Sequence, residues 1–139
     1  MKTPTIYVLV VDDSNDDRQM YALFLAQKGF RVSEASDGAQ AVRMATGLLP
    51  TLIVMDLWLP VLGGWEASRQ LRADKRTMHI PIVVLTARSF VTAEALGCEG
   101  CLIKPCPPEK LYGEILRVLG APQPVIQKVR LSDTAAPTS

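Results

Sequence analysis

The chain has 139 residues, of which 48% are hydrophobic and 21% charged, and its formal net charge at pH 7 is +1. This size and composition fit one globular domain with a buried core, and the small net charge gives no indication of a surface for nucleic acid or membrane. The first apolar run, residues 6–11, ends at two aspartates and is too short for an export signal or a membrane span. We therefore expect a cytoplasmic protein that binds neither nucleic acid nor membrane directly.

The first half of the chain alternates apolar runs with helix-like segments. Residues 6–11 (IYVLVV) are a continuous run rich in β-branched side chains, which is typical of a strand buried on both faces. Residues 16–28 begin with acids and are followed by Gly29, which predicts a helix with a glycine stop. The same signals then predict a strand at residues 30–35 and a short helix at 39–46, ended by Gly47.

The second half repeats this alternation three times. Further strands are predicted at residues 52–55, 82–85 and 101–103, with helices at 65–73, 91–96 and 108–119. Five strand–helix repeats favour an α/β fold, with a doubly wound five-stranded parallel sheet and helices on both faces. We expect one domain at residues 1–120. Residues 121–139 are rich in proline, alanine and small polar residues, so we expect a flexible tail, too short for a DNA-binding domain.

Polar side chains follow four of the five predicted strands. They are Asp12 and Asp13 after the first, Asp56 after the third, Thr86 after the fourth and Lys104 after the fifth. The carboxyl ends of parallel strands share one edge of the sheet, where ligands of such folds bind. The sequence therefore predicts three carboxylates, one hydroxyl and one ammonium group in a single cleft.

Three carboxylates in one cleft repel each other, and without a counter-charge at least one should have a raised pKa. An oxygen-only ligand set with room for water suits Mg²⁺ or Mn²⁺. A divalent ion, the Lys104 ammonium and the Thr86 hydroxyl could together accommodate a phosphoryl group. A carboxylate held beside such an ion can attack phosphorus to form an acyl phosphate.

These residues resemble the receiver domains of two-component response regulators. The resemblance covers residues 6 to about 119 and rests on five fragments in order: VVDD at 10–13, MDLWLP at 55–60, Gly64, TA at 86–87 and KP at 104–105. Each fragment alone is a weak signal, whereas their order and their placement at strand ends make a specific set. The resemblance implies a flavodoxin-like receiver fold.

The resemblance also implies a role for each matching residue. Asp56 would accept a phosphoryl group from a sensor histidine kinase or a phosphotransfer protein. Asp12, Asp13, Asp56 and the backbone carbonyl of Trp58 would hold Mg²⁺. Lys104 would pair with the phosphoryl group, Thr86 would move toward it, and the Lys104–Pro105 bond would be cis. The function implied is that of a single-domain, non-enzymatic phosphorelay switch that signals to a downstream protein.

The sequence departs from the family pattern at several positions. A loop acid is replaced within Leu62-Gly63-Gly64, a bulky Trp58 stands two residues after the acceptor, and Cys101 replaces the usual aromatic residue. The segment between Thr86 and Lys104 is about one helical turn shorter than in many members, so we expect an atypical fourth-helix region.

Two other functions remain open at this point. A receiver-like binding module could work without phosphorylation. A small aspartate-nucleophile phosphatase usually needs a second acid two residues after the nucleophile, and Trp58 occupies that position. Cys98, Cys101 and Cys106 could suggest zinc or redox chemistry, but we expect buried, unreactive thiols that do not converge.

Overall fold

The computed structural model describes residues 5–87 and 97–120. Its centre is a five-stranded parallel sheet in the order β2-β1-β3-β4-β5. The strands are β1 (Tyr7–Val11), β2 (Arg31–Ala35), β3 (Leu52–Met55), β4 (Ile82–Thr86) and β5 (Gly100–Ile103). The described helices are α1 (Asn15–Gln27), α2 (Gly38–Leu48), α3 (Gly64–Ala73) and α5 (Pro108–Val118). The predicted doubly wound α/β fold is confirmed.

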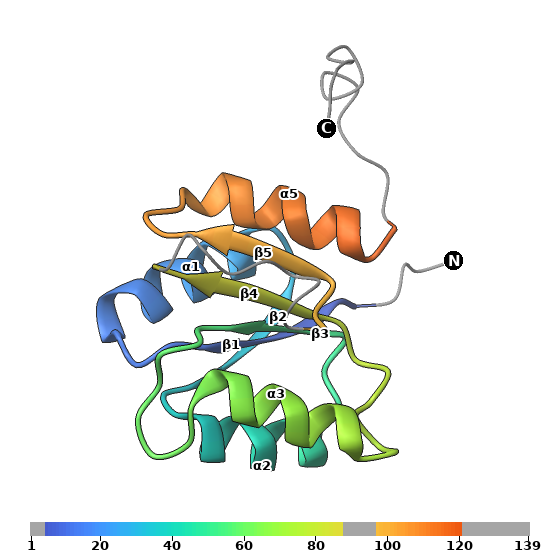
Figure 1. The fold of residues 1–139 in the computed structure, drawn as a ribbon. Coiled ribbons are helices and arrows are strands. Elements are labelled where there is room, and N and C mark those ends of the chain that lie inside the picture. Colours follow the sequence, from blue (N-terminus) through green and yellow to red (C-terminus); the bar gives the residue numbers. More distant parts are fainter. Residues whose placement is uncertain (1–4, 88–96, 121–139) are drawn as a thin grey trace, which may run out of the picture.

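The helices lie in two layers, one on each side of the sheet (Figure 1). Helices α2 and α3 pack on one face together with Leu9 and Val11, and α1 and α5 pack on the other with Val8 and Val10. Alternate side chains of the same strand thus enter opposite layers, as the period of a strand requires. The sheet is buried on both faces, which explains why its strands are continuous apolar runs. Within the described residues, none of the helices is long and apolar enough to cross a membrane.

The predicted boundaries of the described elements agree with the structure within two residues, but the prediction that Gly47 stops the second helix is wrong. Gly47 lies inside α2, which continues to Leu48 and ends where Leu49 adopts a left-handed φ of 50°. One glycine inside a helix costs only about 1 kcal/mol, so packing can carry the helix past it. The predicted helix at residues 91–96 and the predicted tail at 121–139 lie outside the described residues.

The loop between β3 and α3 brings a strained residue to the surface. Val61 is 84% exposed and has a φ of 68°. This left-handed conformation is an outlier for a β-branched residue, whereas asparagine adopts it more readily. The backbone of this loop is therefore held, at Val61, in a conformation that valine disfavours.

Val61→Asn is expected to stabilise the protein, because it relieves this left-handed strain without removing a buried contact. We expect the free energy of unfolding to rise by roughly 1 kcal/mol, measured by urea denaturation with an unchanged m-value. Val61→Thr is the matched control, since it adds polarity but keeps the β-branch. An equal gain in the threonine variant would show that polarity, not backbone strain, is the cause.

Candidate functional site

The register of the two central strands places two carboxylates side by side. Val11 of β1 pairs with Met55 of β3, and the Asp56 backbone N–H donates to the Val11 carbonyl at 3.0 Å. The residues that directly follow these two strands are therefore Asp12 and Asp56. They lie at the point where the strand order reverses. This is the position at which open α/β sheets bind ligands.

The three predicted acids come together there. Asp12, Asp13 and Asp56 each offer a carboxylate oxygen, and these oxygens all lie within 4.8 Å of one another. Asp12 and Asp56 are buried, whereas Asp13 is exposed. This arrangement fits a hard divalent cation, because it combines several oxygen ligands with a side open to water. The three clustered carboxylates are therefore the reason why this position suits Mg²⁺.

Lys104 supplies the positive charge within the site. Its ammonium nitrogen donates to Asp12 Oδ2 at 2.7 Å and to Asp56 Oδ2 at 3.2 Å. Burial by itself would lower the pKa of Lys104, but the hydrogen bond to Asp12 and the charges of Asp56 and Asp12 raise it above its usual range. The side chain is therefore a permanent cation that partly offsets the acids.

Asp56 is 7% exposed, and burial is the main cause of the raised pKa of its carboxyl group. The Trp58 backbone N–H, which donates to Asp56 Oδ1 at 3.1 Å, and the charge of Lys104 both oppose this shift. Repulsion by Asp12 adds only a smaller contribution. The largest cause of the raised pKa is therefore desolvation rather than crowding of like charges.

The remaining predicted residues lie around these groups. Thr86 is fully buried at the end of β4, and its carbonyl accepts the Lys104 backbone N–H at 2.8 Å. The Lys104–Pro105 bond is cis, as the resemblance implied. Trp58 is 54% exposed, and its carbonyl as a metal ligand stays a prediction.

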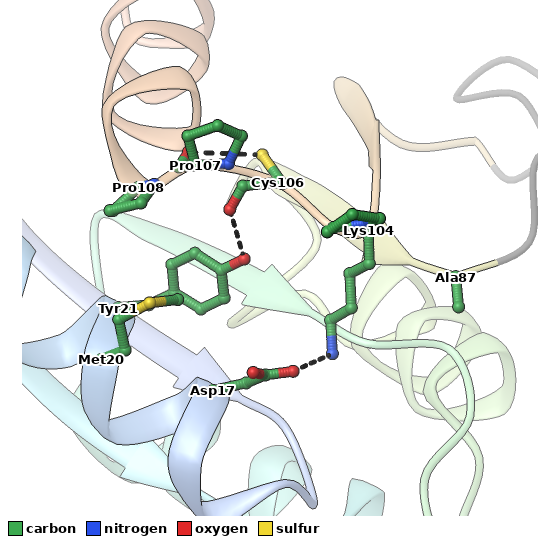
Figure 2. Close-up of a pocket in the computed structure, with 9 residues that line it drawn as sticks. Asp17, Met20, Tyr21, Ala87, Lys104, Cys106, Pro107 and Pro108 are labelled. Atoms are coloured by element: carbon green, nitrogen blue, oxygen red, sulfur yellow. Dashed lines mark hydrogen bonds and ion pairs between the residues drawn. The ribbon is translucent and has the colours of Figure 1, made fainter.

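One site residue was missed by the sequence analysis. Asp17 Oδ2 accepts a hydrogen bond from the Lys104 ammonium at 3.3 Å (Figure 2). Acids in the first turn of a helix are favoured by the helix dipole alone, so their presence at the start of α1 does not by itself indicate a site. The useful signal is its place in the first turn of α1, which begins soon after the acids at the end of β1.

The cysteines do not form a common site. Cys98 and Cys101 pack against the α2–α3 layer, and Cys106 packs in the α1–α5 layer. Cys106 is buried, while the other two are half-buried, which corrects the expectation that all three are buried. Burial raises the pKa of all three thiols, that of Cys98 to about 11. Raised thiol pKa values favour the unreactive, protonated form.

The fold and the acidic cleft are those of a phosphorelay receiver. The family model for the response regulator receiver domain matches residues 8–116, and the chain belongs to this family.

Curated relatives agree with this assignment. The DNA-binding response regulator MtrA of Mycolicibacterium smegmatis is 34% identical over 119 residues, which cover 83% of this chain and 51% of the relative. The phosphate regulon transcriptional regulatory protein PhoB of Pseudomonas aeruginosa is 33% identical over 116 residues, 81% of this chain and 51% of PhoB. The chain thus spans about half the length of the curated relatives it matches.

Solved structures with the same fold include chemotaxis response regulator CheY4 of Vibrio cholerae. The comparison of CheY4 with this chain gives a TM-score of 0.76 and 33% identity, and it covers 83% of this chain and 99% of CheY4. The receiver domain of sensor histidine kinase PA1611 from Pseudomonas aeruginosa PAO1 has a TM-score of 0.78 at 31% identity, covering 85% of this chain and all of that domain. The latter structure has a magnesium ion coordinated in its active site cleft.

Proposed function

We propose that this receiver domain is a switch that accepts a phosphoryl group on Asp56 in a Mg²⁺-dependent reaction. The observation that carries the proposal is the contact of one lysine with two buried acids. Lys104 donates to Asp12 and Asp56, beside a third carboxylate that completes an oxygen cluster. Such a site combines a nucleophile, a cation-binding set and a fixed ammonium group that can pair with phosphoryl oxygens.

In this proposal the donor is a phosphohistidine of a sensor histidine kinase or of a phosphotransfer protein. An Asp56 oxygen attacks phosphorus, the phosphorus–nitrogen bond breaks, and the leaving imidazole takes up a proton. Lys104 and the Thr86 hydroxyl bind phosphoryl oxygens as charge moves onto them. Asp12, Asp13, Asp56 and the Trp58 carbonyl would hold Mg²⁺, with Mn²⁺ as an alternative, and the ion would neutralise phosphoryl charge.

The proposed output is a change of protein surface read by a downstream protein, with no turnover of a separate substrate. We place this activity in the cytoplasm, where a kinase would act on it. The rival phosphatase function is less well supported, because a tryptophan, Trp58, stands at the position where that chemistry usually has its second acid. A binding module that works without phosphate would leave the cluster of three acids and Lys104 unexplained.

The test uses acetyl phosphate as a small phosphodonor and intact-mass spectrometry as the readout. Wild-type protein with Mg²⁺ is expected to gain one phosphoryl group, and chelation of the metal is expected to prevent the gain. Asp56→Asn, which keeps the side-chain shape, is expected to gain none. Equal modification of wild type and Asp56→Asn would overturn the proposal.

Trp58→Asn is expected to shorten the lifetime of the phosphoryl group. Trp58 stands two residues after Asp56, donates its backbone N–H to that side chain, and is half-exposed. Hydrolysis needs a water in line with the phosphorus, and a bulky indole obstructs that approach. The measurement is loss of the phosphoryl mass over time at fixed Mg²⁺. Trp65→Asn, which removes the other half-exposed indole, is the control. Equal or slower loss from Trp58→Asn than from wild type would contradict this account.

Phosphorylation is expected to change amide hydrogen exchange most strongly in residues 57–66. A switch needs an element that can adopt two discrete packings. The aromatic residue usual in this family is replaced here by half-buried Cys101, which has no ring to move between two such packings. Trp58 lies in the loop between β3 and α3, and Trp65 lies just after it. Both are half-exposed and are better candidates to move. A change confined to β5 and α5, with residues 57–66 silent, would show that the ordinary output surface is used. We also expect a response in the loop at residues 88–92, which lies outside the described residues.

A further inference from the structure

Asp17 joins the phosphoacceptor site to a neighbouring cavity. The cavity has a volume of about 650 Å³ and lies between α1 and the segment from β5 to α5, with mainly apolar walls that include Met20, Tyr21 and Cys106. Tyr21 closes one side by donating its hydroxyl to the Cys106 carbonyl at 2.7 Å. Asp17 and Lys104 meet at the other side of this cavity (Figure 2).

The Lys104 ammonium group is fully engaged in this arrangement. An ammonium group has three N–H donors, and three carboxylates accept from it, those of Asp12, Asp17 and Asp56. A phosphoryl group that approaches Asp56 for transfer can bind Lys104 only if one of these bonds is released. The number of donors therefore sets up a competition between carboxylates and phosphoryl oxygens.

The three carboxylates do not compete equally. The side chains of Asp12 and Asp56 are 3% and 9% exposed, whereas that of Asp17 is 42% exposed. Water and salt screen an exposed ion pair far more than a buried one. Asp17 is also one of the two longer contacts, at 3.3 Å. It is thus the partner that Lys104 releases at the lowest cost, and its carboxylate can then be solvated.

We propose that Asp17 is a positioning residue that draws Lys104 toward α1 and limits how readily the lysine binds the phosphoryl group. This inference rests on the proposed function of Asp56. Without Asp17, one N–H donor is available from the start, and the site carries one negative charge fewer. Asp17→Asn therefore accelerates phosphorylation by about 1.5- to fivefold, the range that a half-exposed ion pair supports.

The experiment follows phosphorylation by acetyl phosphate and Mg²⁺ over time by intact mass, at low and high salt. Asp16→Asn is the matched control, because it removes the same charge from the same turn of α1 at an exposed position. Asp17→Glu retains the charge and is expected to stay near the wild-type rate. The gain in Asp17→Asn is expected to exceed that in Asp16→Asn at low salt and to shrink at high salt, which a purely structural role would not produce.

Each outcome decides one of the two proposals. If wild type gains a phosphoryl group but Asp17→Asn behaves like Asp16→Asn, or reacts more slowly than wild type, the inference about Asp17 is overturned and the proposed function stands. If wild type gains no phosphoryl group under these conditions, the proposed function fails and the inference fails with it.

Discussion

Asp13→Ala is expected to abolish both Mg²⁺ binding and phosphorylation while leaving the fold intact. Asp13 contributes one of three clustered carboxylates, yet it is exposed and lies outside β1 and α1. Mg²⁺ keeps several waters and takes few protein ligands, so one lost carboxylate removes a large share of the binding energy. Because the wild-type site already has few ligands, its own affinity should be modest.

The two effects are measured separately. Mg²⁺ binding is followed by tryptophan fluorescence, since Trp58 lies beside the cluster, and phosphorylation by intact mass with acetyl phosphate. Far-UV circular dichroism checks the fold. Asp16→Ala, which removes an exposed acid of α1, should retain both activities. Undiminished Mg²⁺-dependent phosphorylation in Asp13→Ala would refute the assignment of this residue.

Gly64→Ala is expected to be among the most damaging single substitutions in the described part of the chain. A Cβ atom at Gly64 would overlap the Asp56 carbonyl oxygen and lie 2.8 Å from Leu57 Cα. Both are backbone atoms, which cannot rotate away as a side chain can. The substitution therefore forces α3 away from the backbone of Asp56 and Leu57, and we expect a loss of about 3 kcal/mol of unfolding free energy or more.

The neighbouring glycine gives the control. A Cβ atom at Gly63 would meet only the Leu57 carbonyl oxygen, at an ordinary 3.7 Å, and its φ of −64° suits any residue. Gly63→Ala should therefore lose little stability and keep its phosphorylation rate, whereas Gly64→Ala should lose both in urea denaturation and mass assays. Similar behaviour of the two variants would show that the close approach to Asp56 is unimportant.

The positions of the main site residues could be predicted because they follow from a simple rule. Asp12, Asp56 and Lys104 each come directly after an apolar strand, and parallel strands bring their carboxyl ends to one edge. The structure places the ammonium group of Lys104 on both carboxylates. For these three residues, the apolar strand pattern and the parallel order of the sheet predict the same location.

Other features depend on tertiary contacts that no local pattern encodes. A Cβ atom at Gly38 would overlap the Leu62 carbonyl oxygen, so the start of α2 approaches the loop between β3 and α3 closely. Gly47 was misread as a helix stop, because the sequence alone does not show that packing continues α2 to Leu48. Asp17 was missed because a first-turn acid has a sufficient local explanation in the helix dipole.

The central claim, that Asp56 is the residue phosphorylated, is tested most directly by locating the acyl phosphate. Wild-type protein is treated with acetyl phosphate and Mg²⁺ and then reduced with borohydride, which converts an aspartyl phosphate to homoserine. Peptide mass spectrometry then identifies the converted residue. We expect homoserine at position 56 alone, and none after omission of acetyl phosphate. Conversion at Asp12 or Asp13 instead, or no conversion in protein that has gained phosphoryl mass, would contradict the account.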